Sequence, residues 1–232
     1  MDLERSDEQA ALAATVRSVL ATHAPITPYV RSIVDGAATW SPEDRAWVEL
    51  VAIGTTELPS LTDAAIVAEE LGRCCYPGPW VEEVAGRFPS PDAEVVLRAA
   101  DALGAAAAVM EVAVQYAKDR QQFGRPIGAF QAVAHLCVDM LETVELARGG
   151  ILHAAWAADA GDPDAHLAAL RCTAFGDRLV AVAETAIQVL GGIGYTWEHD
   201  AHLWYKRLLT WSSVGGPASR ARVALGRSLL SR

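Results

Sequence analysis

The sequence predicts an all-α protein, and three observations support this fold class. Apolar residues recur at spacings of three and four along most of the chain, and no segment shows the sustained alternation of a β-strand. Hydrophobic residues make up 52% of the 232 residues, which is enough for a sizeable core. The longest periodic stretches are rich in alanine, and small side chains let helices approach closely. An up-down helical bundle is therefore the expected architecture.

Start signals place the first expected helices. Residues 6–9, Ser-Asp-Glu-Gln, have the form of a capping box and predict a helix that runs to about Ala21. Two prolines and a glycine within residues 24–40 predict a loop or short helical pieces. Residues 41–44, Ser-Pro-Glu-Asp, are a second start signal, with serine as the cap and proline at the first helical position. That helix is expected to end near Gly54.

A third helix and a boundary follow. The helix is expected over residues 62–72, opened by Thr62-Asp63 and closed by a glycine. The stretch after it, CYPGPWVEEVAGRFPSPD, is rich in proline and glycine, which are typical of a boundary. We therefore expect a shortened N-terminal helical domain over residues 1–80, a linker over 81–91 and a helical bundle domain over 92–232.

The bundle domain is expected to contain five long helices. Each break between them contains glycine, and three of the four breaks also contain proline. The expected helices cover residues 92–119, 128–160, 164–190, 199–213 and 218–231.

Charge and cysteine usage exclude several classes of protein. The net charge of −10 argues against a non-specific nucleic-acid binder, which needs a basic face. The four cysteines show no metal-ligand spacing, and reduced thiols are expected. The N-terminus is polar and acidic, and no uncharged apolar run is long enough to span a bilayer. We expect a cytoplasmic protein with neither nucleic acid nor membrane as partner.

The stretch DRQQFGRPIGAFQAVAH, residues 119–135, lies between two long helices. The planar guanidinium of Arg120 can pair with a pyrophosphate. Gln122 offers an amide and Phe123 a flat apolar surface, and Gln131 is expected one helical turn into the following helix. The alternative is that these residues only cap a helix and pack a turn, although turn chemistry needs neither the arginine nor the glutamines.

A second polar and glycine-rich stretch is QVLGGIGYTWEHD, residues 188–200. Gln188 precedes Gly191 and Gly192, whose missing side chains let a backbone approach a phosphate. The alternative is an ordinary helix C-terminus, where one glycine is common. With Gly194 the stretch holds three glycines, more than such an end requires.

The two stretches, in this order and one helical hairpin apart, resemble the C-terminal helical domain of acyl-CoA dehydrogenases. The resemblance covers residues 92–232 well and residues 1–80 loosely. It implies an FAD-dependent removal of a proton and a hydride from an acyl-CoA. It also implies that both stretches contact the ADP half of the FAD held by a neighbouring subunit, through Arg120, Gln122, Phe123, Gln131, Gln188, Gly191 and Gly192.

The chain departs from the family in two places. Between Gly78 and Asp92 there is no room for the middle β-domain that covers one face of the flavin in the family. Residues 211–216, Trp-Ser-Ser-Val-Gly-Gly, hold no carboxylate where many members place the catalytic base as Tyr-Glu-Gly. Loss of a general base slows proton abstraction by about 10²–10⁴-fold.

The chain looks most like the degenerate subunits of actinobacterial α2β2 acyl-CoA dehydrogenases, several of which act on CoA thioesters of steroid side chains. This resemblance implies a subunit that supplies no base and completes the FAD site of a full-length partner. The partner would bind most of the acyl-CoA.

Two other functions stay open. The first alternative is a non-catalytic helical scaffold that has lost flavin. The second is an independent enzyme that uses Glu94 as its base. A minority of the family places the base at the start of the first bundle helix, near Glu94. The ordinary role of an acidic residue there is to favour the helix dipole.

Two further patterns lie near the end of the bundle. His199 and His202 flank Asp200 as a metal pair would, but no third ligand is identifiable, so an exposed helix start is expected. Tryptophans recur every seven residues and predict a core or interface stripe, at Trp197, Trp204 and Trp211.

Overall fold

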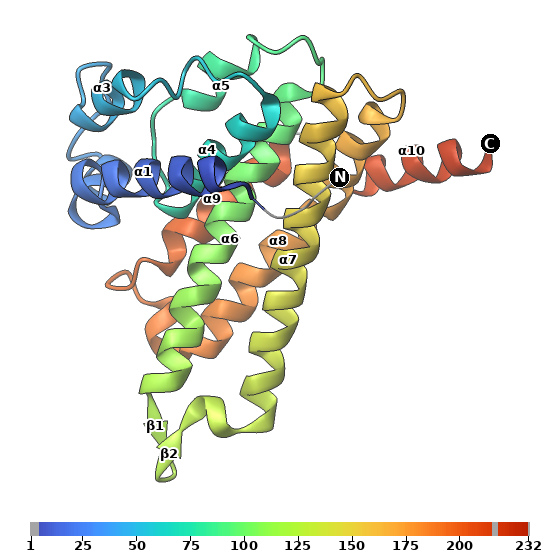
Figure 1. The fold of residues 1–232 in the computed structure, drawn as a ribbon. Coiled ribbons are helices and arrows are strands. Elements are labelled where there is room, and N and C mark those ends of the chain that lie inside the picture. Colours follow the sequence, from blue (N-terminus) through green and yellow to red (C-terminus); the bar gives the residue numbers. More distant parts are fainter. Residues whose placement is uncertain (1–4, 215–217, 232) are drawn as a thin grey trace.

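The computed structural model describes residues 5–214 and 218–231, and it confirms the all-α fold (Figure 1). The helices are α1 (Asp7–His23), α2 (Arg31–Val34), α3 (Arg45–Ala52), α4 (Leu61–Arg73), α5 (Trp80–Ala85), α6 (Ala93–Asp119), α7 (Gln131–Asp159), α8 (Ala165–Leu190), α9 (Ala201–Val214) and α10 (Ala218–Leu230). Shorter helical turns are η1 (Ile26–Val30), η2 (Ile127–Ala129) and η3 (Gly191–Tyr195). Strands β1 (Gln121–Gln122) and β2 (Arg125–Pro126) form an antiparallel hairpin.

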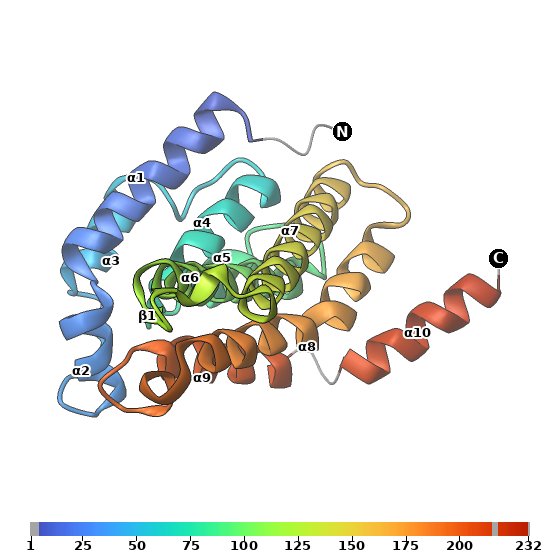
Figure 2. The same cartoon turned by 90° about the horizontal axis from the view of Figure 1, so that it is seen from below.

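Helices α6, α7, α8 and α9 pack together as the expected up-down bundle. Figure 1 shows α6 and α7 as a long arm with the β1–β2 hairpin at its far end. Helices α1 to α5 gather around the opposite end of α6, and α10 leaves the side of the bundle (Figure 2). None of the described helices is both long and apolar enough to cross a membrane.

The N-terminal helices join the bundle through a very close crossing of α4 and α6. A Cβ added to Gly72 would lie 1.8 Å from the carbonyl oxygen of Asp101. A Cβ added to Gly104 would lie 1.8 Å from the carbonyl oxygen of Glu69. Because neither position has room for a side chain, the two backbones touch, and the fully buried alanines of α6 continue this close packing.

The start of α1 matches its sequence signature. The hydroxyl of Ser6 accepts a hydrogen bond from the backbone N–H of Gln9 at 3.2 Å, and the Gln9 side chain accepts one from the Ser6 N–H at 3.1 Å. The capping box is therefore confirmed. The expected short helical pieces within 24–40 are η1 and α2.

The second helix begins later than expected. The start signal at Ser41 predicts a helix from residue 42, but α3 begins at Arg45. The carboxylate of Asp44 accepts a hydrogen bond from the Ser41 N–H at 2.9 Å and closes a turn there instead. Local side-chain bonding to the backbone thus competes with the first helical turn.

The cap of the third helix also differs from the prediction. Ser60, not Thr62, is the N-cap of α4, and its hydroxyl accepts a hydrogen bond from the Asp63 N–H at 3.0 Å. The carboxylate of Asp159, at the end of α7, accepts hydrogen bonds from the N–H groups of Leu61 at 2.7 Å and Thr62 at 2.9 Å. A side chain from the bundle therefore satisfies the exposed start of this helix.

The segment expected as a linker, residues 81–91, is partly helical. It contains most of α5, whose first residue, Trp80, is fully buried and donates a hydrogen bond to the Thr55 hydroxyl at 3.2 Å. Seven residues, Gly86 to Asp92, then lead into α6. The chain has no room there for a β-domain, as expected.

The predicted tryptophan stripe holds for two of its three members. Trp204 is buried and donates to the Arg73 carbonyl at 2.8 Å, and Trp211 packs over Gly176. Trp197 precedes α9 and is exposed, so it does not share their helix face. The expected break at residues 215–217 lies outside the described residues.

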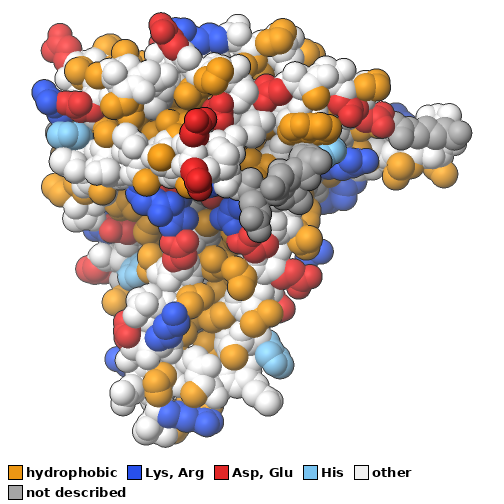
Figure 3. Space-filling view, in the orientation of Figure 1, with side chains coloured by type: hydrophobic (Ala, Val, Ile, Leu, Met, Phe, Trp, Pro, Cys, Tyr) orange, Lys and Arg blue, Asp and Glu red, His pale blue; other side chains and the backbone are white. Residues whose placement is uncertain are grey.

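The face shown in Figure 3 divides into two kinds of surface. Basic and acidic side chains lie close together beneath α1. Hydrophobic side chains gather lower down, along the arm formed by α6 and α7.

Candidate functional site

The first candidate segment begins where α6 ends. Arg120 leaves the helix in an extended conformation, and its N–H donates to the Tyr116 carbonyl at 2.8 Å. Its own carbonyl accepts a hydrogen bond from the Ile127 N–H at 2.8 Å. In the hairpin that follows, Gln122 pairs with Arg125. The backbone that carries the Arg120 side chain is therefore fixed on both sides.

The tip of this hairpin is a two-residue turn with an unusual occupant. Phe123 and Gly124 both have positive φ, at 52° and 78°. This matches a type I′ turn, which favours the twist of a hairpin and prefers Asn-Gly. A bulky residue such as phenylalanine rarely adopts this conformation, which costs about 1–3 kcal/mol. Phe123 is nevertheless 92% exposed, so burial does not offset the strain.

Aromatic contacts hold the base of the hairpin. The rings of Phe123 and Phe130 meet edge to face, with centroids 6.1 Å apart. The guanidinium of Arg125 lies 4.1 Å from the centroid of the Phe130 ring. These contacts orient the Phe123 ring while leaving most of its surface open to a ligand.

The other predicted residues of this segment also face solvent. Arg120, Gln122 and Gln131 are all exposed. Within the described part of the chain, the Arg120 guanidinium takes part in no ion pair or hydrogen bond. Gln131 is the first residue of α7 rather than one turn inside it, because η2 occupies the start of the expected helix. The structure thus brings these three residues and Phe123 into one short region.

The second candidate segment lies at the end of α8. Gly191 ends the helix with φ of 65°, and its N–H donates to the carbonyls of Ile187 and Gln188. A Cβ at Gly192 would meet nothing within 4 Å, whereas one at Gly194 would lie 2.9 Å from the Ile187 carbonyl oxygen. Internal packing therefore explains Gly194 but leaves the surface at Gly192 open. The Gln188 side chain is exposed.

Figures 1 and 2 place the two segments toward the same end of the bundle, with the end of α8 beside the end of α6.

The loop that follows η3 is anchored to the N-terminal helices. The carboxylate of Asp200 accepts hydrogen bonds from the Thr27 hydroxyl at 2.9 Å and the Arg31 guanidinium at 2.7 Å. Contacts between residues 169 and 173 positions apart thus fix this loop.

His199 and His202 make hydrogen bonds with backbone groups at the start of α9. The Nδ1 atom of His199 accepts a hydrogen bond from the Ala201 N–H at 3.1 Å. His202 donates from Nδ1 to the His199 carbonyl at 2.8 Å and stacks on the Trp197 ring, with centroids 4.2 Å apart. Among the described residues, no group of three or more His, Cys, Asp and Glu side chains is placed to hold a metal ion.

Glu94 lies far from both segments. It stands in the first turn of α6, and Arg120 follows the last turn, so about 39 Å of helix separates them. Its half-exposed carboxylate accepts a hydrogen bond from Arg98 at 2.9 Å, and Arg98 also binds Glu82 at 2.9 Å. The structure therefore does not bring Glu94 together with the predicted cofactor residues.

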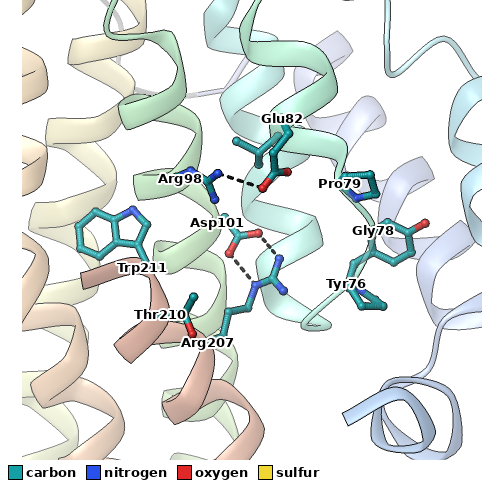
Figure 4. A pocket seen from close by; sticks show the side chains of 11 residues that line it. Tyr76, Gly78, Pro79, Glu82, Arg98, Asp101, Arg207, Thr210 and Trp211 are labelled. Atoms are coloured by element: carbon teal, nitrogen blue, oxygen red, sulfur yellow. Dashed lines mark hydrogen bonds and ion pairs between the residues drawn. The ribbon is translucent and has the colours of Figure 1, made fainter. Parts of the chain in front are cut away.

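A pocket near that end of α6 was not predicted from the sequence. Figure 4 shows this cavity of about 240 Å³ between the 76–79 loop, α5, α6 and α9. At its centre, Arg207 donates from Nε to Asp101 at 2.6 Å and makes a second bond from Nη2. The pair joins residues 106 positions apart, so no local pattern in the sequence predicts it. The labelled lining residues are Tyr76, Gly78, Pro79, Glu82, Arg98, Asp101, Arg207, Thr210 and Trp211.

The charged groups of this pocket neutralise one another. Burial disfavours the charged form of Arg207, but the Asp101 carboxylate outweighs burial and raises the pKa of the guanidinium. Asp101 is only 7% exposed, and the Glu82 carboxylate is bound to Arg98. Burial also raises the pKa of Tyr76 to about 12. The lining carboxylates are thus held in ion pairs rather than presented to a ligand as a base.

The family model that describes the acyl-CoA dehydrogenase C-terminal domain matches residues 92–230, more than half of the chain. The chain belongs to the acyl-CoA dehydrogenase family.

Curated members of this family align with part of the chain. The acyl-CoA dehydrogenase FadE34 of Mycobacterium tuberculosis is 49% identical over 129 residues, which are 55% of this chain and 18% of FadE34. The acyl-CoA dehydrogenase IpdE2 of the same organism is 41% identical over 129 residues, which are 54% of this chain and 39% of IpdE2. The aligned region spans well under half the length of both relatives.

Several solved structures share all or part of the fold. A chain of the ChsE4-ChsE5 complex from Mycobacterium tuberculosis matches all of this chain and all of its own length, with a TM-score of 0.87 and 17% identity. A variant of the Tcur3481-Tcur3483 steroid ACAD matches 97% of this chain and 98% of its own, with a TM-score of 0.83 and 20% identity. Butyryl-CoA dehydrogenase from Megasphaera elsdenii is 30% identical and matches 60% of this chain and 36% of its own, with a TM-score of 0.57.

Proposed function

We propose that this chain is a subunit of a heteromeric, FAD-dependent acyl-CoA dehydrogenase that supplies no base and completes the FAD site of a full-length partner. The observation that carries the proposal is the hairpin at the end of α6. Its backbone is fixed, its tip holds Phe123 in a strained conformation, and Arg120 faces solvent without a partner among the described residues. Strain that the chain itself does not use suggests a ligand contact.

The residues present fit the ADP half of FAD. Arg120 suits the planar recognition of a pyrophosphate, and the open backbone at Gly191 and Gly192 leaves room for phosphate oxygens. Gln122, Gln131 and Gln188 add amide groups, and Phe123 a flat ring, all exposed. The chemistry that FAD would supply when bound is that of a hydride acceptor. This chain's share of the work is to bind and orient that cofactor.

The rest of the chain offers no complete site of its own. The seven residues between α5 and α6 leave no room for the domain that covers the flavin in the family. Neither place where the family puts its base offers an unpaired carboxylate: Glu94 is bound to Arg98, and residues 211–216 contain no Asp or Glu. We therefore assign proton abstraction to the partner.

The comparisons favour a steroid-type substrate and a heteromeric assembly. Two structures with this fold are the ChsE4-ChsE5 complex and a steroid ACAD. By analogy with them, the chain forms a cytoplasmic α2β2 assembly in which the partner binds most of the acyl-CoA. The acyl group of this substrate is a steroid side chain.

Expression with and without a partner tests this function. The chain should be colourless or insoluble when it is produced alone. Co-produced with a full-length acyl-CoA dehydrogenase subunit encoded near its gene, it should yield a yellow complex. A yellow, active homo-oligomer of this chain alone would contradict the proposal, and loss of its turnover in Glu94→Gln would support the independent enzyme. A stable complex without flavin would support the scaffold.

A further inference from the structure

A histidine side chain holds the end of the loop between η3 and α9. The backbone N–H of Ala201, the first residue of α9, donates a hydrogen bond to Nδ1 of His199 at 3.1 Å. Because a backbone N–H can only donate, this Nδ1 must carry a lone pair, and the His199 ring is neutral in this arrangement. His202 binds the backbone of the same residue, since its Nδ1–H donates to the His199 carbonyl at 2.8 Å.

Histidine is an unusual residue for the start of a helix. Asp200 directly precedes α9 and belongs to a type preferred as a cap, but its carboxylate accepts hydrogen bonds from Thr27 at 2.9 Å and Arg31 at 2.7 Å. The first N–H of α9 is bound by His199 instead. An aspartate or serine would accept this bond at any pH near neutral, whereas a histidine loses its acceptor when it is protonated. The bond at the start of α9 therefore depends on pH.

The surroundings of His199 oppose its protonation. Burial has the largest effect on the pKa of the ring and lowers it, Asp200 raises it, and His202 and Arg31 lower it. The positive end of the α9 dipole also disfavours an imidazolium at this place. The charged and titratable groups that face the loop are Arg31 from α2, Glu198 and Asp200 within the loop, and His202 and Lys206 from α9.

Hydrogen bonds connect His199 to the glycine segment of the proposed FAD site. The His199 N–H donates to the Thr196 carbonyl at 3.4 Å. The N–H and hydroxyl of Thr196 donate to the Ile193 carbonyl at 3.1 and 2.9 Å. Ile193 lies within η3 and directly follows Gly192. Figure 2 shows the loop between η3 and α9 beside α2. The open backbone at Gly192 is thus bonded, turn by turn, to the start of α9.

We propose that His199 is a positioning residue that holds the glycine segment ready for the ADP half of FAD and releases it on protonation, an inference that rests on the proposed function. The bond between the Ala201 N–H and His199 Nδ1 is the latch. When Nδ1 takes up a proton, two N–H groups face each other across 3.1 Å, so the latch opens and the loop loosens.

The direction of the pH dependence follows from the held ring. A released histidine titrates near its ordinary pKa of about 6.5, whereas burial lowers the pKa of the held His199. The latch therefore contributes fully above about pH 6.5 and weakens as the pH falls below that value. FAD binding should weaken over the same range.

Substitutions of His199 test the latch in the yellow complex obtained by co-expression. The FAD affinity of the parent complex should fall about threefold from pH 8 to pH 6. His199→Ala should weaken FAD binding at both pH values by a similar factor, because the Ala201 N–H loses its acceptor. His199→Asn should restore most of that loss without a pH dependence, because an asparagine oxygen accepts a bond from the N–H two residues on.

His166→Asn is the matched control. His166 is exposed and lies in the first turn of α8, at the opposite end of that helix from the glycine segment. The His166→Asn complex should keep the pH dependence of the parent. A loss of the pH dependence in this variant would overturn the assignment of the effect to His199.

Nitrogen NMR of isotope-labelled histidine measures the latch without reference to FAD. The neutral His199 ring should carry its proton on Nε2 and should titrate below the ordinary histidine range. A neutral ring with its proton on Nδ1 would overturn the latch. So would an Arg120→Ala complex with weakened FAD binding beside a His199→Asn complex that keeps the parent's pH dependence. FAD affinity that is unchanged in both Arg120→Ala and His199→Ala would overturn the proposed function and the latch together.

Discussion

The two ends of α6 treat their charged groups in opposite ways. Near its start, Asp101 is bound to Arg207, and Glu94 is bound to Arg98. Beyond its end, Arg120 faces solvent in a hairpin whose backbone is already fixed. The first region pairs its charged groups within the chain, whereas under the proposed function the second keeps Arg120 for a ligand from outside. The predictions below test each side of this comparison.

The largest effect is expected at the pocket. Arg207→Met should lower the free energy of unfolding by about 3 kcal/mol, because it leaves the buried Asp101 carboxylate without its partner. Urea denaturation measures the loss. Adding Asp101→Leu to the Arg207→Met variant should restore much of the lost free energy of unfolding. Arg222→Met is the matched control, since its ion pair with Asp177 is exposed and should matter little. Equal losses of stability in the two single variants would contradict the buried environment of the Asp101 carboxylate.

A smaller effect of opposite sign is expected at the hairpin. Phe123→Asn should raise the free energy of unfolding by about 1 kcal/mol, because Asn-Gly suits a turn with positive φ at both residues. Thermal denaturation detects the change. The same substitution should lower the FAD content of the complex. Phe130→Asn is the control and should destabilise the chain, because it removes the contacts with Phe123 and Arg125. A destabilised Phe123→Asn would show that the turn is not strained.

Cysteine reactivity separates the surface of the arm from the interior. Burial raises the pKa of the Cys74 and Cys172 thiols to about 12, and raises that of Cys75 further. Because a raised pKa keeps a thiol protonated, these three should react slowly with iodoacetamide at pH 8. Burial also raises the pKa of the Cys137 thiol, but by less, so Cys137 should be alkylated first, and its rate should rise as the pH increases. Mass spectrometry gives the order, and faster labelling of Cys74 would contradict the described packing.

The smallest effect on stability is expected from Arg120→Ala in the isolated chain. The side chain is exposed and has no partner among the described residues, so the free energy of unfolding should change by less than about 0.5 kcal/mol. Urea denaturation of Arg120→Ala and Arg207→Met under the same conditions compares their losses of free energy of unfolding directly. A loss comparable with that of Arg207→Met would give Arg120 a structural role instead.

Helical periodicity and caps predict most of the fold but not its details. The capping box at Ser6 and the long alanine-rich helices are local signals, and the structure agrees with them. The start at Ser41 was wrong because Asp44 forms a competing turn. Helix α5 was missed because proline and glycine surround it, while its stability comes from burying Trp80.

In the candidate site, too, local sequence predicts some features and not others. The hairpin residues and the glycines form two short stretches of the sequence, so local signals predict them as candidates, and their contact with a cofactor stays a prediction. The sequence was not enough to predict the positive φ of Phe123 or the open space at Gly192, which depend on the folded backbone. The Asp101–Arg207 pair and the Asp200 contacts join distant parts of the chain. Such pairs follow from tertiary packing, which periodicity does not encode.

The most direct test of a cofactor site completed in trans is the FAD content of the Arg120→Ala complex. The variant is co-produced with the full-length partner, and bound flavin is measured per complex by absorbance during titration with FAD. Loss of a charge-assisted pair with a pyrophosphate should weaken FAD binding by about 10–100-fold while assembly is retained. Unchanged FAD affinity in an intact complex would contradict the proposed role of this chain.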